Sequence, residues 1–204
     1  MTSVLSAGAI LLAGGRGSRV DGATKPLFEM GGRTLLRRAV DAVRDAGAHP
    51  IAVAAPVLDA ALRVDWVRED PPFGGPVAGA VAALDMWAAS GIAPTWTFLL
   101  ACDLPGAEAA VTRLSADLAL LPQDSDGLCL GDGGSRPQWL TGVYRTRALQ
   151  EAAAALPDRG RNAPVRALTA DLAITVVRAP DAETLDVDTW EDLEVARRRA
   201  EEDS

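Results

Sequence analysis

The chain alternates short apolar runs with longer segments of helical periodicity, and this alternation limits the fold more than any other feature of the sequence. Apolar runs predict strands over residues 9–13, 51–55, 64–67, 95–101, 128–130, 138–144 and 172–177. Apolar positions three or four residues apart predict helices over residues 35–46, 76–89, 107–121, 147–156 and 189–201. We therefore expect an α/β protein with a mostly parallel sheet and one antiparallel pair in its second half.

The length and composition of the chain suit one folded unit. Its 204 residues are 49% hydrophobic, which is enough for a single sizeable core. We expect a single domain over residues 1–204, with Rossmann-like layers (α/β/α) around a mixed, mostly parallel sheet. Ligands of such sheets bind at the carboxyl ends of the strands. The loops that follow predicted strands directly are 14–25, 69–79 and 102–105.

The charge balance and the cysteine count exclude several classes of function. A net charge of −8 disfavours broad binding to nucleic acid. Cys102, Cys129 and the single His49 do not form the closely spaced set that a disulfide framework or a zinc site needs. The apolar segment 4–13 lacks the basic region of a signal peptide and the length of a membrane span. We expect a cytoplasmic protein that binds neither nucleic acid nor membranes.

Glycines and cations share one loop after the first predicted strand, in the stretch LLAGGRGSRVDGATKPL (residues 11–27). Gly14, Gly15 and Gly17 let the backbone approach a ligand and turn N–H groups toward an anion. Arg19 and Lys25 add positive charge, so phosphate is the expected ligand. The loop is not a P-loop, because proline follows the lysine and no glycine precedes it. It also lacks the third glycine of a dinucleotide fingerprint.

Lys25 is the only lysine among the 20 Lys and Arg residues of the chain. Lysine offers a compact charge on a flexible stem, whereas arginine offers a planar fork. A crowded pocket in which one phosphate oxygen must be reached favours the lysine. We therefore predict that Lys25 contacts a phosphate group.

Three acidic residues stand where they could serve a ligand. Asp103 follows the central predicted strand and either binds Mg²⁺, which prefers oxygen ligands, or caps the next turn. Asp188 either completes such a metal site or caps the closing helix, and the local sequence favours the cap. Asp70 precedes a glycine pair and the helix opened by Pro76, and suits a hydrogen bond to a ribose or a base.

Five motifs occur in one order along nearly the whole chain and resemble those of a known family. They are LAGGRGSRVDGATKPLFEMGGRTL (12–35), GGPVAG (74–79), CDLP (102–105), RPQWLTGVY (136–144) and DVDTWEDL (186–193). The combination resembles the nucleotidyltransferases with a glycosyltransferase-A-like fold, and most closely the molybdenum cofactor guanylyltransferases of the MobA-like family. The chain departs from the family pattern at RVDG (19–22), where the family has RMG.

The resemblance implies a reaction and its participants. GMP would be transferred from GTP to (molybdenum-)molybdopterin, forming molybdopterin guanine dinucleotide and pyrophosphate, with Mg²⁺ as cofactor. GTP and molybdopterin would be the substrates, and molybdoenzymes or other cofactor-assembly proteins are candidate partners. The N-terminal half would bind the nucleotide and the C-terminal half the acceptor.

The resemblance also implies roles for single residues. The nucleotide would meet the backbone of Leu12, Ala13, Gly14 and Gly15, with Arg19 and Lys25 on the triphosphate and Asp70 on the nucleoside. Asp103 would ligate Mg²⁺, assisted by Asp188, and catalysis would depend on Lys25, Arg19 and Asp103. Arg136, Arg159 and Arg161 are either contacts of the pterin acceptor, which would lie over the second half of the sheet, or solvated loop arginines.

Three other functions are compatible with parts of this pattern. A molybdopterin cytidylyltransferase would differ in base choice, and Gly14 in LAGG, where cytidylyl relatives tend to carry LAAG, favours guanine. A sugar-1-phosphate nucleotidyltransferase would share the first half, but the short chain has no long sugar-binding insert. A non-enzymatic nucleotide-binding module would tolerate the loss of Asp103 and release no pyrophosphate.

Overall fold

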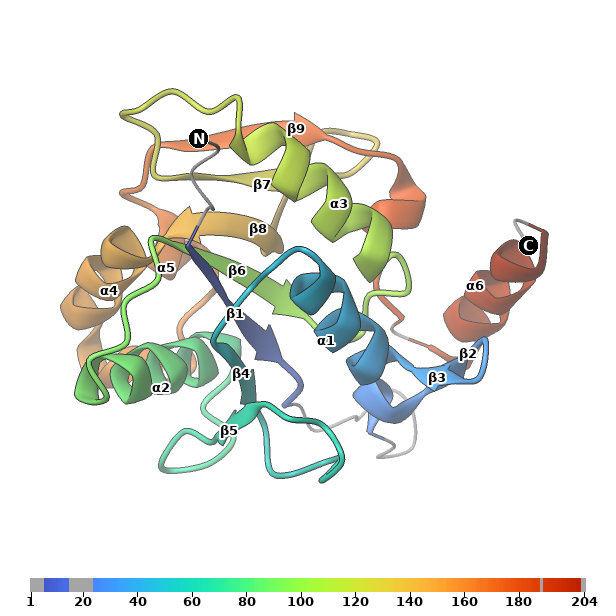
Figure 1. The fold of residues 1–204 in the computed structure, drawn as a ribbon, viewed down its shortest axis with the longest axis horizontal. Coiled ribbons are helices and arrows are strands. Elements are labelled where there is room, and N and C mark those ends of the chain that lie inside the picture. Colours follow the sequence, from blue (N-terminus) through green and yellow to red (C-terminus); the bar gives the residue numbers. More distant parts are fainter. Residues whose placement is uncertain (1–5, 15–23, 188, 203–204) are drawn as a thin grey trace.

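A computed structural model describes residues 6–14, 24–187 and 189–202, and it contains a seven-stranded mixed sheet in the order β5-β4-β1-β6-β8-β7-β9 (Figure 1). The strands of this sheet are β1 (Ala7–Leu12), β4 (Ile51–Ala54), β5 (Asp65–Val67), β6 (Trp96–Ala101), β7 (Gly127–Gly131), β8 (Pro137–Arg145) and β9 (Ile174–Arg178). Two further short strands, β2 (Glu29–Met30) and β3 (Arg33–Thr34), form a hairpin of their own. All neighbours in the large sheet are parallel except those of β8, which runs antiparallel to both β6 and β7.

Helices cover both faces of the sheet. The helices are α1 (Leu35–Asp45), α2 (Pro76–Ala89), α3 (Ala107–Leu118), α4 (Thr146–Ala155), α5 (Arg166–Thr169) and α6 (Trp190–Glu202), with short 3₁₀ turns η1 (Lys25–Leu27), η2 (Pro157–Gly160) and η3 (Asp181–Glu183). One apolar core lies between the sheet and α1 with α3, and a second lies between the sheet and α2 with α4 and α5. The expected three-layer α/β/α fold is therefore confirmed.

The predicted elements are all present, with shifts of a few residues at their ends. Helix α2 has the predicted bounds because Pro76, whose missing N–H is tolerated in the first turn, opens it. Helix α1 begins at Leu35 as predicted, and Thr34 caps it: its Oγ1 accepts a hydrogen bond from the Arg37 N–H at 3.2 Å. Helix α3 ends at Leu118 instead of residue 121, since Pro122 disfavours helical backbone before it. The β2–β3 hairpin, α5 and the 3₁₀ turns are not among the elements expected from the sequence.

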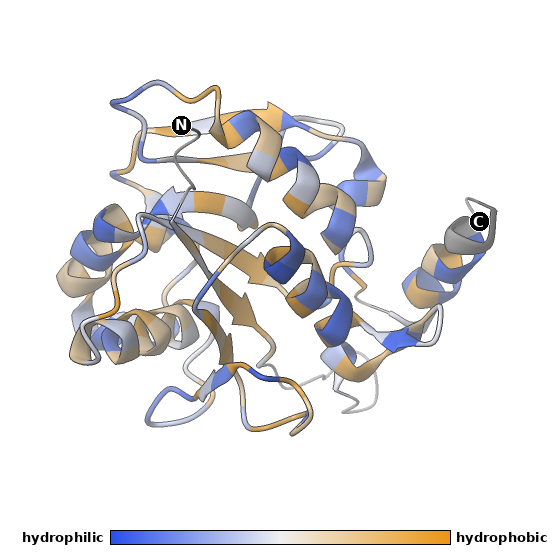
Figure 2. Ribbon diagram, in the orientation of Figure 1, coloured by the Kyte–Doolittle hydropathy of each residue, from blue (hydrophilic) through white to orange (hydrophobic). Residues whose placement is uncertain are grey.

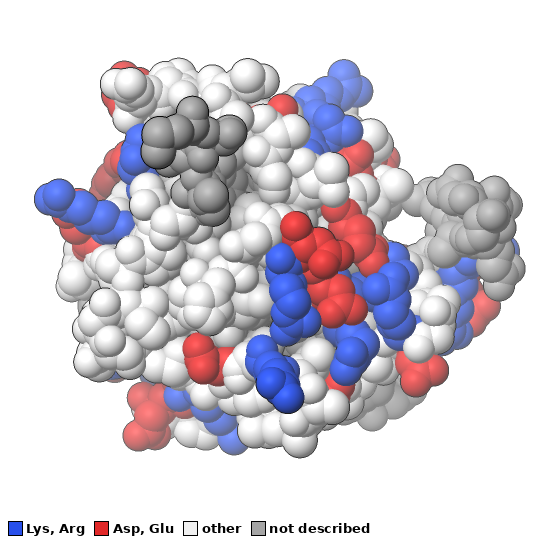
Figure 3. All heavy atoms as spheres, viewed as in Figure 1, with Lys and Arg blue, Asp and Glu red and all other residues white. Residues whose placement is uncertain are grey.

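The central strands of the sheet consist mostly of hydrophobic residues, whereas the helices combine hydrophobic and hydrophilic residues along their length (Figure 2). The outer side of α1 carries charged side chains of both signs, as Figure 3 shows. Arg38 of α1 and Arg33 of β3 both bind the Glu108 carboxylate, at 2.5 and 3.1 Å, and so connect α1 and β3 to α3. Within the described ranges, no helix is long and apolar enough to cross a membrane.

We predict that the buried hydrogen bond between Thr97 on β6 and Thr146 on α4 stabilises the docking of α4 on the sheet. Their Oγ1 atoms lie 2.7 Å apart, and both residues are buried. Thr97→Val should lower the free energy of unfolding by about 1–3 kcal/mol, because it leaves the other hydroxyl without its partner. Urea denaturation measures this change. The double variant with Thr146→Val should lose less than the two single changes together, and strict additivity would contradict the prediction.

Candidate functional site

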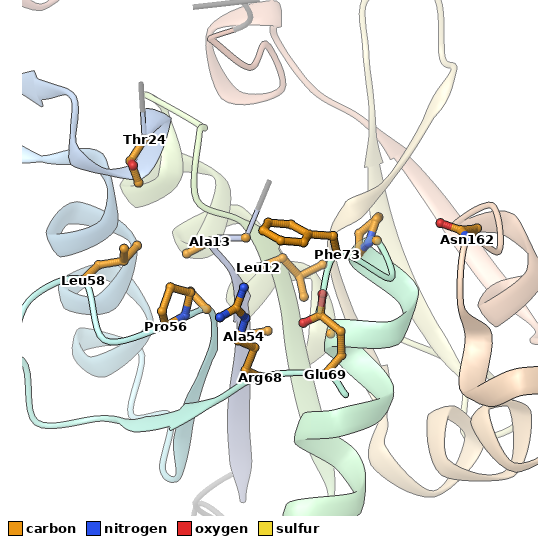
Figure 4. Close-up of a pocket in the computed structure, with 15 residues that line it drawn as sticks. Leu12, Ala13, Thr24, Ala54, Pro56, Leu58, Arg68, Glu69, Phe73 and Asn162 are labelled. Atoms are coloured by element: carbon orange, nitrogen blue, oxygen red, sulfur yellow. The ribbon is translucent and has the colours of Figure 1, made fainter. Parts of the chain in front are cut away.

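The carboxyl ends of four parallel strands meet at one edge of the sheet, and a cavity lies there beside β1, β4 and β5. Strands β1, β4, β5 and β6 are in parallel register, so Leu12 pairs with both Ala54 and Ala101, and Ala54 pairs with Val67. The cavity has a volume of ≈ 520 Å³. Its lining consists of Leu12, Ala13, Gly14, Thr24, Ala54, Ala55, Pro56, Leu58, Arg68, Glu69, Phe73, Gly75, Pro76, Gly79 and Asn162 (Figure 4).

The backbone after β1 and the first turn of α2 enclose this cavity. Leu12, Ala13 and Gly14, expected to meet the base and ribose, all belong to the lining. Gly79 lets α2 lie close to β4, because a Cβ there would come within 3.1 Å of the Ala54 Cβ. The N-terminus of α2, preceded by Gly75 at φ +90°, also opens on the cavity, and such a terminus favours negative charge.

The loop between β5 and α2 supplies residues that the sequence analysis did not single out. Glu69 lines the cavity and its Oε1 accepts a hydrogen bond from the Gly74 N–H at 3.1 Å. Phe73 lines it as well and has φ +66°. The Arg68 guanidinium lies over the Phe73 ring, with Cζ 5.2 Å from the ring centroid. No periodicity marks these residues, but their place in the loop before GGPVAG is a signal that could have drawn attention to them.

Asp70 lies beside this cavity and is not part of its lining. It lines a second cavity of ≈ 550 Å³, together with Arg159 and Arg161. Glu69, the residue before Asp70, is the acidic residue of this loop that lines the first cavity. The contact of Asp70 with a nucleoside stays a prediction.

The three arginines considered for the acceptor are divided between two places. Arg159 pairs with Asp85 of α2, and the Arg161 Nη1 donates to the Pro71 carbonyl at 3.0 Å. These two residues thus lie against α2 and the loop that precedes it. Arg136 is exposed in the β7–β8 turn, where its N–H donates to Asp132 Oδ1 at 2.9 Å. An acceptor role for any of them stays a prediction.

Asn162 joins the site from a segment far along the chain. Its backbone N–H donates to the Gly74 carbonyl at 2.7 Å, and the residue lines the first cavity. Gly160, two residues earlier, has φ +72°, and a Cβ there would come within 2.5 Å of the Val77 Cγ1. The turn around Gly160 can therefore pack directly on the first turn of α2. The sequence offers no signal that this loop reaches the first cavity.

The segment around the start of α6 contacts both the loop that carries Asp103 and the turn that carries Lys25. Asp103 is half-buried directly beyond β6, and its carbonyl accepts a hydrogen bond from the Val187 N–H at 2.9 Å. Trp190 at the start of α6 stacks on Phe28, with ring centroids 4.6 Å apart. Phe28 follows η1 directly and its N–H donates to the Lys25 carbonyl. The DVDTWEDL segment thus contacts both the CDLP motif and the Lys25 turn.

Three predicted site residues, Gly15, Arg19 and Asp188, lie outside the described residues. Among the described residues, Thr189 caps the start of α6. The Thr189 Oγ1 accepts from the Asp192 N–H at 3.2 Å, and Asp192 Oδ2 accepts from the Thr189 N–H at 2.7 Å. This reciprocal arrangement is a capping box, for which T-x-x-D is the sequence signal.

The residues at this edge fit a magnesium ion that is held partly by a substrate. Among the residues that the structure describes, no group of three or more His, Cys, Asp or Glu could hold a metal ion. Mg²⁺ commonly uses only one or two protein carboxylates, together with phosphate oxygens and water. The half-buried carboxylate of Asp103 at the strand end is of this kind.

The two cysteines do not supply a nucleophile. Cys102, the residue before Asp103, is buried. Its backbone N–H donates to the Leu12 carbonyl at 3.0 Å. Burial, and to a smaller extent the charge of Asp103, raises the pKa of the Cys102 thiol far above its usual value. Burial also raises the pKa of Cys129 to about 12. Both side chains are therefore thiols at neutral pH.

Comparison with known proteins identifies the family. Residues 9–174 match the family described as the MobA-like NTP transferase domain. The chain belongs to this family. A probable molybdenum cofactor guanylyltransferase of Opitutus terrae is 33% identical over 201 residues, 95% of each chain. A molybdenum cofactor guanylyltransferase of a Bradyrhizobium species is 31% identical over 199 residues, 94% of this chain and 92% of the relative.

The fold of this MobA-like nucleotidyltransferase also occurs among solved structures. A nucleotidyl transferase from Methanothermobacter superposes with a TM-score of 0.73 over 97% of this chain and 99% of the other, at 20% identity. The resemblance expected from the five motifs is thereby confirmed, and so is the expected fold. The match to the family covers four of those motifs wholly or in large part, and the fifth, at 186–193, lies beyond it.

We predict that both cysteines resist thiol reagents in the folded protein at pH 8. The raised pKa values keep them protonated, and burial blocks access, so native labelling should be slow compared with labelling in denaturant. Mass spectrometry after a timed iodoacetamide pulse gives the extent of reaction at each residue. Rapid native alkylation of Cys102 would contradict the prediction and reopen a nucleophilic role beside Asp103.

Proposed function

We propose that this nucleotidyltransferase transfers GMP from GTP to the terminal phosphate of molybdopterin and releases pyrophosphate. The observation that supports it most is the cavity at the strand ends, enclosed by the LAG backbone and the N-terminus of α2. The names of the two relatives, each aligned over more than nine-tenths of this chain, supply the base and the cofactor pathway.

The proposed chemistry is a displacement at phosphorus. An oxygen of the acceptor phosphate attacks the α-phosphorus of GTP, the bond from that phosphorus to the bridging oxygen breaks, and pyrophosphate leaves. The acceptor oxygen is already a nucleophile, so no covalent intermediate on the protein is needed. The protein's task is to align the two substrates and to balance negative charge.

Each part of the site has a task in this proposal. The cavity residues bind the base and ribose, while Lys25, with Arg19, binds the triphosphate as a source of positive charge. Asp103, with Asp188, would hold Mg²⁺, which supplies Lewis-acid neutralisation of the phosphate oxygens. Lys25 suits this task because a single flexible ammonium can follow a phosphate oxygen as its charge changes.

The acceptor belongs, in this proposal, along the same edge of the sheet toward β7. Strand β7 is parallel to β9 and both end at this edge, where the turn carrying Arg136 lies. Arg159 and Arg161 lie nearer the nucleotide and would contact the acceptor only at its phosphate end. A cytoplasmic location and exchange with molybdoenzymes or other cofactor-assembly proteins complete the proposal, as the sequence predicts.

We predict that the protein binds GTP more tightly than CTP when Mg²⁺ is present. The fold does not choose the base, so the comparison of the two nucleotides tests the guanylyl assignment directly. Calorimetric titration should give a lower Kd for GTP. A preference for CTP would transfer the protein to the cytidylyl branch, and equal weak binding of both would contradict the nucleotide site.

We predict that Asp103→Asn and Lys25→Ala each reduce GMP transfer on the order of a hundred-fold or more, because each removes a charge that balances the reacting phosphates. Pyrophosphate release with GTP, Mg²⁺ and molybdopterin measures the reaction, and circular dichroism checks the fold. Asp124→Asn is the matched control, since Asp124 is exposed between α3 and β7. Undiminished transfer by both site variants would refute the assignment of these residues. Nucleotide binding by the unmutated protein without any pyrophosphate release would refute the proposed reaction.

A further inference from the structure

Phe73 is a large apolar side chain that stands half exposed in the lining of the first cavity. Phe73 is 51% exposed, whereas the next residue, Gly74, is buried. Its φ of +66° is rare for any residue other than glycine and costs energy for a bulky one. Neither the family resemblance nor the motifs assign a task to this residue.

Contacts on three sides hold the Phe73 turn in this conformation. Glu69 accepts the Gly74 N–H, and the Gly74 carbonyl accepts the Asn162 N–H. Arg161 binds the carbonyl of Pro71 on the other side of the turn. A strained backbone that is fixed by contacts within its loop and from the distant segment 161–162 places its side chain with little freedom.

Phe73 and Arg68 both line the cavity, and the Arg68 guanidinium lies over one face of the Phe73 ring. Arg68 is exposed, so a base that stacks on this face replaces its guanidinium. Leu12 and Ala13, where β1 ends, line the same cavity as Phe73 (Figure 4). A planar guanidinium such as that of Arg68 and a planar nucleobase can both stack on the face of an aromatic ring.

We propose that the Phe73 ring stacks on the base of the bound nucleoside triphosphate. The proposal rests on the proposed function, because it takes the nucleotide site to be the first cavity. Every base has a π face, and the larger face of a purine covers more of the ring than a pyrimidine does. Phe73 therefore adds affinity for the base and favours GTP over CTP, while the phosphates are held elsewhere.

The test compares GTP with inorganic tripolyphosphate, which has the phosphates but no base. Phe73→Asn removes the ring and keeps a residue that tolerates positive φ, so the turn should persist. Its Kd for GTP should rise roughly ten-fold, within the range known for the loss of one base–aromatic stack, and its Kd for tripolyphosphate should stay unchanged. Phe73→Tyr, which retains a ring, should bind both ligands like the unmutated protein.

Val57→Ala is the matched control, because Val57 is also exposed and apolar, follows the lining residue Pro56, and is not itself in the lining. Titration calorimetry with Mg²⁺ gives the affinity of each protein for each of the two ligands, and thermal unfolding shows whether the turn is intact. Unchanged GTP binding by Phe73→Asn overturns the stacking proposal alone, as does an equal loss for GTP and tripolyphosphate. Failure of the unmutated protein to bind GTP overturns the proposed function and the stacking with it.

Discussion

The parallel pairing of β1 with β4 on one side and β6 on the other is the constraint on which the rest of the structure depends. Strand β1 is buried along its whole length, so each of its peptide groups must find a partner in a neighbouring strand. The register places Leu12 level with Ala54 and Ala101. Because three strands end together, the loops after them meet at one edge, and the cavity forms there.

Backbone hydrogen bonds then attach two distant segments to that edge. The Asn162 N–H binds Gly74, and the Val187 N–H binds Asp103, so residues from the last quarter of the chain complete a site begun in the first. Small residues make these approaches feasible, as Gly160 does against Val77. The site is thus an assembly of loops held by a rigid sheet, and its side chains can vary without altering the strands.

The strands and the long helices could be predicted because burial leaves a periodic trace in the sequence. Pro76 and Thr34 marked the starts of two helices through local backbone chemistry that needs no tertiary contact. Glu69 and Asp70 show where such reasoning ends. Two adjacent carboxylates look alike in a sequence, but the path of the loop puts only Glu69 in the lining of the first cavity.

The sequence by itself determined the succession of strands and helices along the chain, the glycine loop with its single lysine, and the family to which the chain belongs. These features depend on residue type and local spacing, which a sequence records directly. Only the tertiary structure decided that Phe73 borders the cavity, that Asn162 joins it, and that Arg136 stands apart from Arg159 and Arg161. These contacts result from the packing of loops on α2. The packing brings together segments some 90 residues apart, as in the hydrogen bond between Arg161 and Pro71, and neither segment carries a periodic pattern that predicts it.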